Sequence, residues 1–312
     1  MAFLSISAIP GPNLFEIAES RWAAIQAERP DLTPALDLQR RLLRIVIDVS
    51  QALDGGRLPR LSLPPKYVAA KLTRSVPLFA GEPIPLPLPL LTPAIGALCD
   101  ALAAGGAGDA ATHIAQAIDG GAIEPGSFLG ASLARNQAAI RTGATHRGLS
   151  PDLLWLVGEL AVSPYVHLLQ RRHLAEPSDP DLRAAADAWS AGHCPACGSW
   201  PAVAEVVSSS GGGHRTLRCS FCAAAWELDT YACIYCGEDG EGFVTAAPDD
   251  ERKDRRLELC HHCGGYLKTI DVAELSPFPL LAISDIETTD LDVAAMEHRF
   301  ARPALREFGA RR

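Results

Sequence analysis

The strongest constraint on the fold of this 312-residue chain is a set of four Cys-x-x-Cys pairs toward its C-terminus. Two thiolates three residues apart can hold one metal ion, and small neighbouring residues let the amides of the loop point at the sulfurs. In a reducing compartment, thiol pairs at such spacings are more often metal ligands than disulfides. We therefore predict metal ligands at eight positions, which are Cys194, Cys197, Cys219, Cys222, Cys233, Cys236, Cys260 and Cys263.

The spacing of the pairs suggests an internal duplication. Cys194/Cys197 and Cys219/Cys222 are separated by residues 198–218, and the next two pairs are separated by residues 237–259. Arg215 and Arg256 each lie four residues before the third cysteine of their unit. A repeated rubredoxin-like or zinc-ribbon unit, with a β-hairpin between its two pairs, accounts for this pattern. It favours sequential pairing into two four-cysteine sites, although the spacing is also compatible with interleaved pairs.

A closed four-thiolate site is a structural or redox site rather than a hydrolytic one. Zinc and iron both accept four thiolates in tetrahedral geometry, so the sequence predicts two metal ions, Fe or Zn, without choosing between them. Four sulfurs leave no open coordination position for a water molecule. We therefore expect no catalytic residues and no enzymatic activity. With eight cysteines available, nearby histidines are not expected to be ligands: His193, His214, His261 and His262.

The first 190 residues carry helix signals. A capping residue followed by proline predicts five helix starts, at Thr33, Thr92, Ser150, Ser163 and Asp179. Apolar side chains recur at helical spacing, and glycine pairs at residues 55–56, 105–106 and 120–121 supply stops. We expect seven or eight helices, with the proline-rich residues 83–89 extended across the helices.

These patterns predict the domain organisation. An N-terminal all-α domain is expected over residues 1–190, because the composition changes at Ala191-Gly192. Two tandem rubredoxin-like or zinc-ribbon units are expected to follow, at residues 191–231 and 232–312, the second with a final helix around residues 291–300. The predicted fold class is α plus small β.

Charge and hydropathy indicate the setting in which the chain works. The net charge is −9, and residues 191–270 contain seven Lys or Arg against eleven Asp or Glu. This acidic balance disfavours nucleic-acid binding, which depends on basic surfaces. No Lys or Arg precedes the first apolar residues, and prolines and Asp100 interrupt the most apolar stretch, residues 83–104. We therefore expect a cytoplasmic protein without membrane insertion.

With these residues laid out, the chain resembles the formate dehydrogenase accessory protein FdhE family. The likeness rests on residues 194–199, residues 217–222 with Trp226, the third pair, and the fourth pair with Tyr266-Leu267-Lys268. It continues in Asp285, Thr288 and Leu291-Asp292, and at the front in Leu14-Phe15, Arg21 and a helix containing Gln51. Residues 27–33 and 284–290 are less regular than the family pattern.

The resemblance implies a cytoplasmic factor needed to make active respiratory formate dehydrogenase. Such a factor would act on the catalytic subunit, which contains molybdenum and selenocysteine or cysteine, before its twin-arginine-dependent export. The alternatives are a zinc-ribbon nucleic-acid-binding protein, which the acidic balance opposes, and a rubredoxin-type electron-transfer protein. The sequence does not determine the oligomeric state.

Overall fold

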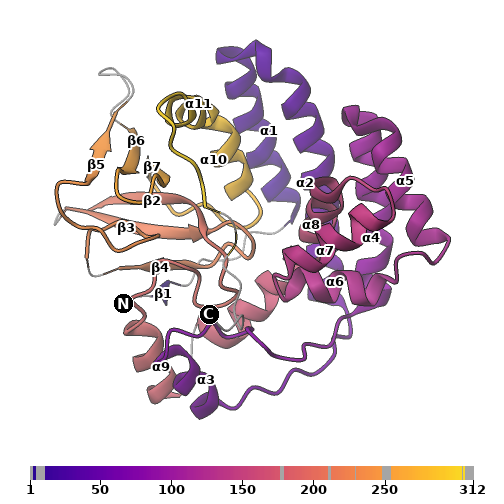
Figure 1. The fold of residues 1–312 in the computed structure, drawn as a ribbon, viewed down its shortest axis with the longest axis horizontal. Helices are drawn as coiled ribbons and strands as arrows, with labels where there is room; N and C mark the ends of the chain where they lie inside the picture. Colours follow the sequence, from indigo (N-terminus) through magenta and orange to yellow (C-terminus); the bar gives the residue numbers. More distant parts are fainter. Residues whose placement is uncertain are drawn as a thin grey trace. The chain divides into compact units, whose positions relative to one another are not determined.

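The computed structural model describes residues 3–4, 11–175, 179–209, 212–228, 230–247, 254–303 and 305. The chain forms two compact units. Figure 1 shows the ribbon with its elements labelled and coloured along the sequence. The sheet unit comprises Met1–Ala8, Leu63–Ala80 and Gln170–Arg306. The helical unit comprises Ile9–Ser62, Gly81–Leu169 and Glu307–Arg312.

Apolar stripes build the helical unit. The predicted stripe on the first helix is confirmed, since Leu14, Ala18, Trp22 and Ile25 are all buried. Trp22 also donates a hydrogen bond from its indole nitrogen to Gln39 Oε1 at 2.7 Å, which ties the first two helices together. The main helices are α1 (Gly11–Glu28), α2 (Thr33–Gly55), α4 (Leu88–Leu102), α5 (Gly108–Asp119), α6 (Pro125–Leu133), α7 (Gln137–His146) and α8 (Pro151–Gln170, whose last residue begins the sheet unit). Short helical turns η1 (Pro30–Leu32) and η2 (Ala103–Ala107) connect them.

Three of the five predicted helix starts are confirmed, at Thr33, Pro151 and Pro180. The other two are wrong, because Pro93 and Pro164 lie inside α4 and α8. Each proline removes one backbone donor from its helix. The buried faces around them keep both helices continuous, since tertiary packing supplies most of the stability of a helix in a protein.

The proline-rich segment was predicted to be extended over residues 83–89. Residues 82–87 have no regular secondary structure, but Leu88 and Pro89 already belong to α4, so the end of the prediction is wrong. The hydroxyl of Tyr165, in α8, donates a hydrogen bond to the Pro85 carbonyl at 2.9 Å. This contact fastens the segment to one of the chain's own helices.

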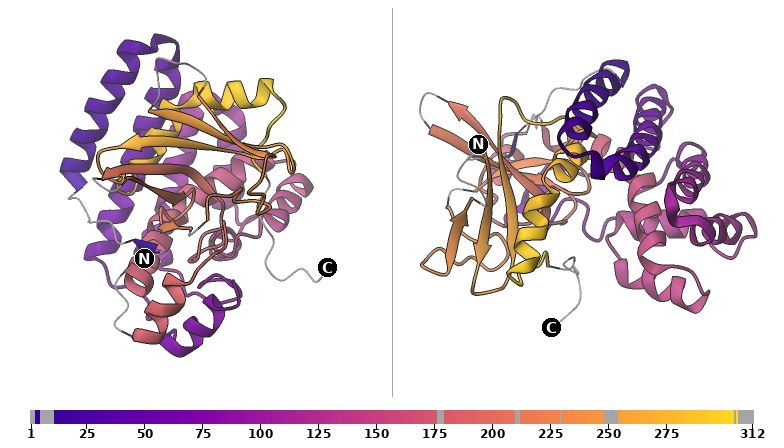
Figure 2. Two further views of the ribbon diagram at one scale, coloured as in Figure 1. Left: turned by 90° about the vertical axis from the view of Figure 1, so that its left-hand side faces the viewer. Right: turned by 90° about the horizontal axis from the view of Figure 1, so that it is seen from above.

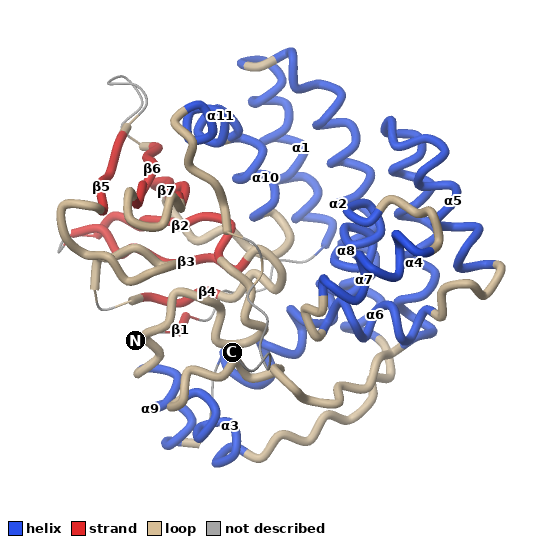
Figure 3. Tube along the Cα trace, in the orientation of Figure 1, coloured by secondary structure: helices blue, strands red, loops and turns tan. Residues whose placement is uncertain are grey.

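A seven-stranded sheet forms the centre of the other unit (Figure 3). Its strands lie in the order β1-β4-β3-β2-β7-β6-β5. The β2/β7 pair is parallel, with Val203 beside Lys268, and every other pair is antiparallel. The strands are β1 (Phe3–Leu4), β2 (Pro201–Ser209), β3 (Gly212–Cys219), β4 (Ala225–Glu227), β5 (Phe243–Ala246), β6 (Arg255–Cys260) and β7 (Tyr266–Val272).

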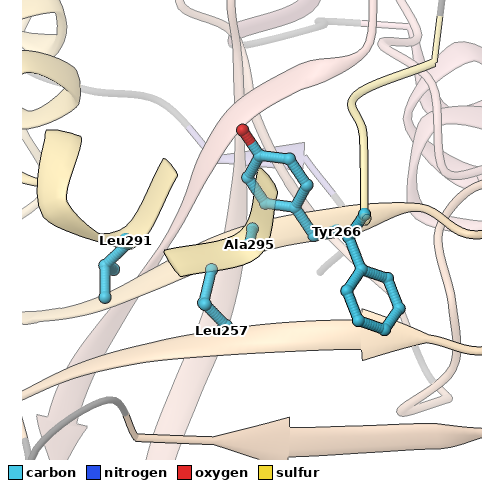
Figure 4. Packing of buried hydrophobic residues seen from close by; sticks show 5 residues of the cluster. Leu257, Tyr266, Leu291 and Ala295 are labelled. Carbon is cyan, nitrogen blue, oxygen red and sulfur yellow. The ribbon is translucent and has the colours of Figure 1, made fainter. Parts of the chain in front are cut away.

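Two C-terminal helices pack along this sheet. α10 (Leu281–Glu287) and α11 (Thr289–Glu297) run along it, as both views of Figure 2 show. In Figure 4, Leu291 and Ala295 of α11 lie over Leu257 and Tyr266 of the strands. The remaining helices of the unit are α3 (Pro65–Leu72), which packs on α9 (Pro180–Asp187), and the short turn η3 (Arg171–Ala175).

The predicted fold class is confirmed: an N-terminal helical region precedes a small mixed sheet with two four-cysteine clusters. A strand near the N-terminus was not predicted. This strand, β1, pairs with β4 and places Phe3 opposite Trp226. The compact units also divide the chain elsewhere than residue 190, because α3 and α9 belong with the sheet. The three-part division at residues 190 and 231 stays a prediction.

Two helical stretches are long and apolar enough to cross a membrane by length and composition, at Leu88–Asp119 and Pro151–Leu174. The first is interrupted at Gly106, whose φ of 112° is not helical. In the second, 67% of the most apolar window is buried inside the protein. Burial of this kind is typical of a core helix, which passes the same test of composition.

Candidate metal centres

The four Cys-x-x-Cys loops share one backbone conformation. In each, the residue after the second cysteine has a positive φ and donates its N–H to the carbonyl of the first cysteine, at 2.8–3.2 Å. The first cysteine in turn donates its N–H to the carbonyl one residue further on, at 2.8–2.9 Å. The residues with positive φ are Gly198 (81°), Ala223 (53°), Gly237 (80°) and Gly264 (69°). In three loops the glycine after the second cysteine indicates this conformation in the sequence, because a positive φ favours glycine. The loop of Cys219 and Cys222 has alanine at this position and carries no such signal.

The first cluster joins the loop after α9 to the end of β3. Cys194 Sγ lies 3.6 Å from Cys222 Sγ, and Cys197 Sγ lies 3.4 Å from Cys219 Sγ. All four side chains are buried. The backbone N–H groups of Phe221 and Cys222 point at Cys219 Sγ, each at 3.4 Å.

The second cluster joins the loop before β5 to the turn between β6 and β7. Cys233 Sγ lies 3.7 Å from Cys263 Sγ, and Cys236 Sγ lies 3.6 Å from Cys260 Sγ. Cys233 and Cys260 are buried, whereas Cys236 and Cys263 are exposed. The structure thus groups the eight cysteines in chain order.

Both clusters fit a tetrahedral four-thiolate ion. The sulfur atoms of each cluster all lie within 4.8 Å of one another, and the measured separations exceed the disulfide bond length of about 2.05 Å. An ion with metal–sulfur bonds of about 2.3 Å places its four sulfurs about 3.8 Å apart. The separations of 3.4–3.7 Å are close to that value.

The thiol pKa values follow the environment of each sulfur. Burial raises the pKa of Cys194 and of Cys222 well above the ordinary range, and it also raises the pKa of Cys233. At Cys260 burial acts in the same direction, but the N–H of Cys263 and the Cys236 thiol bring the pKa below its ordinary value. The sulfurs of Cys194 and Cys222 therefore favour the neutral thiol unless a cation is present. A coordinating metal removes the proton, so loading the first cluster releases protons.

Aromatic side chains pack around the loops, as expected of residues that shield the sulfurs. Phe221 and Trp226 are buried, and the rings of Trp200 and Tyr235 meet edge to face with centroids 5.0 Å apart. The Tyr235 hydroxyl donates to the Tyr266 carbonyl at 3.0 Å. These contacts belong to the packing between the loops.

The histidines near the loops belong to neither sulfur cluster, and the ninth cysteine belongs to neither as well. His193 is buried between Trp189 and Trp200, and His261 packs against Phe300. Within the described residues, the groups of side chains arranged to hold a metal contain cysteine alone. Cys99 is buried on α4, and burial raises its pKa to about 11.

A buried ion pair beside the first cluster was missed by sequence reasoning. Arg218, which precedes Cys219, contacts the carboxylate of Glu205 on the neighbouring strand, and both side chains are fully buried. Arg218 also donates to the Ser276 carbonyl at 2.6 Å, while Glu205 accepts from the Ser276 N–H at 3.1 Å. Burial lowers the pKa of Arg218, although the Glu205 carboxylate opposes that shift. This pair holds the segment before α10 against the β2–β3 hairpin.

A second charged network supports the turn near the other cluster. Lys268 Nζ contacts Asp285 Oδ1 at 2.7 Å and Asp292 Oδ2 at 2.8 Å. Arg302 contacts the same two carboxylates, each at 2.9 Å. Tyr266 donates to Asp292 at 2.8 Å. All of these charges are paired, so the network fastens α10 and α11 to β7.

A segment from the N-terminal half covers the first cysteine loop. We call residues 76–80 the strap. Leu78 N donates to the Pro195 carbonyl at 2.8 Å, and Phe79 N donates to the Ala196 carbonyl at 2.9 Å. Lys71 holds the strap from α3, because its ammonium donates to the carbonyls of Leu78 and Ala80, at 2.9 and 2.7 Å. No local sequence pattern indicated this contact.

Comparison with known proteins finds FdhE relatives. The chain is 30% identical over 115 residues to a protein FdhE homolog of Pectobacterium carotovorum, a match that spans 37% of each chain. It is 28% identical over 163 residues to a homolog of Haemophilus ducreyi, covering 51% of this chain and 49% of that protein. The sequence matches therefore span half or less of the length of these relatives. No family model matches the sequence.

The fold is similar over a longer stretch. The crystal structure of the FdhE protein from Pseudomonas aeruginosa matches with a TM-score of 0.60 at 22% identity, covering 98% of both chains. At that identity the likeness shows the fold alone. The chain is therefore similar to FdhE proteins in sequence over part of its length and in fold over nearly all of it.

Proposed function

We propose that the chain binds two metal ions through its eight clustered cysteines and serves as an accessory factor in the assembly of formate dehydrogenase. The observation that carries this proposal is the pair of four-sulfur clusters in a chain related to FdhE proteins. The proposed partner is the catalytic subunit of formate dehydrogenase, and the proposed location is the cytoplasm.

In this proposal the metal ions stabilise the sheet unit. Cys194, Cys197, Cys219 and Cys222 would hold one ion, and Cys233, Cys236, Cys260 and Cys263 the other. Each ion, iron or zinc, would cross-link two loops that are far apart in sequence. Four thiolates fill a tetrahedral ion, so a role in assembly fits this arrangement better than hydrolysis does.

The charge pattern favours a protein partner over nucleic acid. Arg215 forms a two-contact pair with Glu258 at 2.5 and 2.6 Å, and Arg256 is paired with Asp271. Two other basic residues of this region, Arg252 and Lys253, lie outside the described residues. Arginines neutralised by carboxylates contribute little to the basic surface that nucleic-acid binding needs.

A capture experiment tests the proposal. The tagged chain is expressed in cells of its source organism that make formate dehydrogenase and is then isolated without oxygen. We expect the catalytic subunit to be recovered with it, and formate dehydrogenase activity to fall when the chain is deleted. A tagged chain with Cys99→Ser is the control and should recover the same subunit, because this thiol lies in neither cluster. Full enzyme activity in the deletion strain would contradict the proposal.

A further inference from the structure

The two clusters differ in their access to solvent. The side chains of the first cluster are between 0% and 4% exposed, at Cys194, Cys197, Cys219 and Cys222. In the second cluster, the second cysteine of each pair is exposed, which leaves Cys236 and Cys263 open to solvent. Two clusters with the same loop geometry therefore offer very different access to a reagent in solution.

The strap explains part of this difference. Its two backbone hydrogen bonds to Pro195 and Ala196 close over the first cysteine loop. Leu78 and Phe79 are themselves buried there, at 0% and 3% exposure. In the first cluster's other loop, Phe221 is buried as well. An approaching ligand would have to displace the strap before it reached these sulfurs.

We propose that the second cluster is the exchangeable metal site of the chain, while the first releases its ion much more slowly. This inference rests on the proposed binding of two ions. In exchange, the donor atoms of an incoming ligand replace the thiolates one after another, and each released sulfur takes up a proton or binds another ion. Exposed Cys236 and Cys263 permit that attack directly. The first cluster permits it only after local opening, whose free energy slows the reaction.

Metal release from the zinc-loaded full chain tests this assignment. The chain is first shown by native mass spectrometry to carry two zinc ions, and EDTA is then added together with N-ethylmaleimide. Peptide mapping follows the alkylation of each cysteine with time. We expect one ion to leave first, together with alkylation of Cys233, Cys236, Cys260 and Cys263. The expected difference in rate is at least about tenfold, which an opening free energy of about 1.4 kcal/mol would produce.

A variant that weakens the attachment of the strap to α3 separates the role of the strap from other differences between the clusters. Lys71→Met removes the two hydrogen bonds that Lys71 gives to the strap, and we expect faster release from the first cluster with an unchanged rate at the second. Lys66→Met is the matched control, because Lys66 lies exposed on the same helix. The comparison of the two clusters in the unsubstituted chain does not depend on how well either variant folds.

The outcomes are distinguishable. Fewer than two zinc ions at the start would contradict the proposed metal binding itself. Two ions that leave at the same rate, or an ion lost first from the cluster of Cys194, would overturn the inference while leaving the metal binding intact.

Discussion

Arg218 and Glu205 form a fully buried ion pair between adjacent strands of the sheet unit. A buried pair of this kind gains little over a well-packed apolar pair, but the loss of one partner leaves a charge without compensation. The Ser276 backbone depends on both side chains, through the N–H that Glu205 accepts and the carbonyl that Arg218 contacts. The stability of the sheet unit should therefore depend strongly on keeping the pair complete.

We expect Glu205→Gln to lower the free energy of unfolding by about 3–5 kcal/mol, because it leaves the Arg218 cation buried without its counter-charge. Chemical denaturation of the metal-loaded chain measures this change. The double variant Glu205→Leu with Arg218→Met should lose less than the single variant.

The control for this prediction is the more exposed pair of Arg256 and Asp271 on the same sheet. Asp271→Asn should change the stability by less than about 1 kcal/mol, as is usual for solvent-exposed pairs. Equal losses at the buried and exposed positions would show that the burial of Arg218 has been misjudged.

The left-handed residue of each cysteine loop gives a second prediction at this scale. Gly237 has a φ of 80°, and a Cβ added there would meet no atom within 4 Å. Gly237→Ala should therefore cost about 1 kcal/mol through backbone strain alone. Thermal unfolding of the metal-loaded protein measures the loss. Gly130→Ala in α6 is the control, since it also adds a Cβ in open space without a positive φ and should cause no loss.

At the residue scale, the eight cysteines were predictable because their spacing is local. The structure brings all eight together in two groups of four. Glu205 and Ser276 are 71 residues apart, and no local pattern marks them as partners. Ala223 was not predictable for a different reason, since alanine rarely adopts the conformation that its loop requires.

Among the elements, helix α11 covers strands β6 and β7 of the sheet with apolar side chains. Leu291 is completely buried against Leu257 and Tyr266, while Val293 on the same helix is 51% exposed. This contrast allows a paired test of how much the helix contributes to the sheet unit.

Leu291→Ala should lower the free energy of unfolding by about 2–5 kcal/mol, because it removes buried methyl groups and leaves a cavity. Val293→Ala should change it by less than about 0.5 kcal/mol, as expected for an exposed position. Denaturant titration of both variants checks the prediction. Similar losses from the two substitutions would mean that α11 does not pack on the sheet as described.

Elements that depend on neighbouring residues could be predicted from the sequence, whereas pairings between distant segments could not. The hairpin between the first two cysteine pairs was expected, and β2 and β3 form it. The parallel pairing of β2 with β7 was not expected, because it joins residues 65 positions apart, such as Val203 and Lys268, from the two predicted repeat units. Helix starts were wrongly predicted at Pro93 and Pro164, because the surrounding core keeps both helices continuous through these prolines.

For the whole molecule, we predict that metal stabilises one unit and not the other. The helical unit buries its own stripes, including Trp22 and the faces of α2 and α4. The sheet unit instead has its loops tied through the cysteine clusters. Metal-dependent folding is expected where the ligand loops have little other core.

Removing both ions under reducing conditions should therefore raise amide hydrogen exchange in β2, β3, β6 and β7 and leave α2 and α8 protected. Mass spectrometry of the exchanged peptides measures this, and restored protection after zinc addition is the control. Unchanged protection of the strands in metal-free protein would mean that the sheet unit folds without its ions.

The organisation of the whole chain was only partly readable from its sequence. The change in composition near residue 190 marks where the cysteine loops begin. The compact units include earlier segments with the sheet, because α3 contacts α9 and the strap contacts the first cysteine loop, each more than a hundred residues away. Such contacts depend on tertiary packing, which leaves no local periodicity in the sequence.

The metal content of the folded chain tests the proposed binding of two ions most simply. Native mass spectrometry of protein isolated without oxygen should give a mass that corresponds to one chain with two zinc or iron ions. The double variant Cys194→Ser with Cys197→Ser should lose one of them. A folded chain that carries no transition metal, with its eight clustered cysteines free, would show that the clusters are not metal sites.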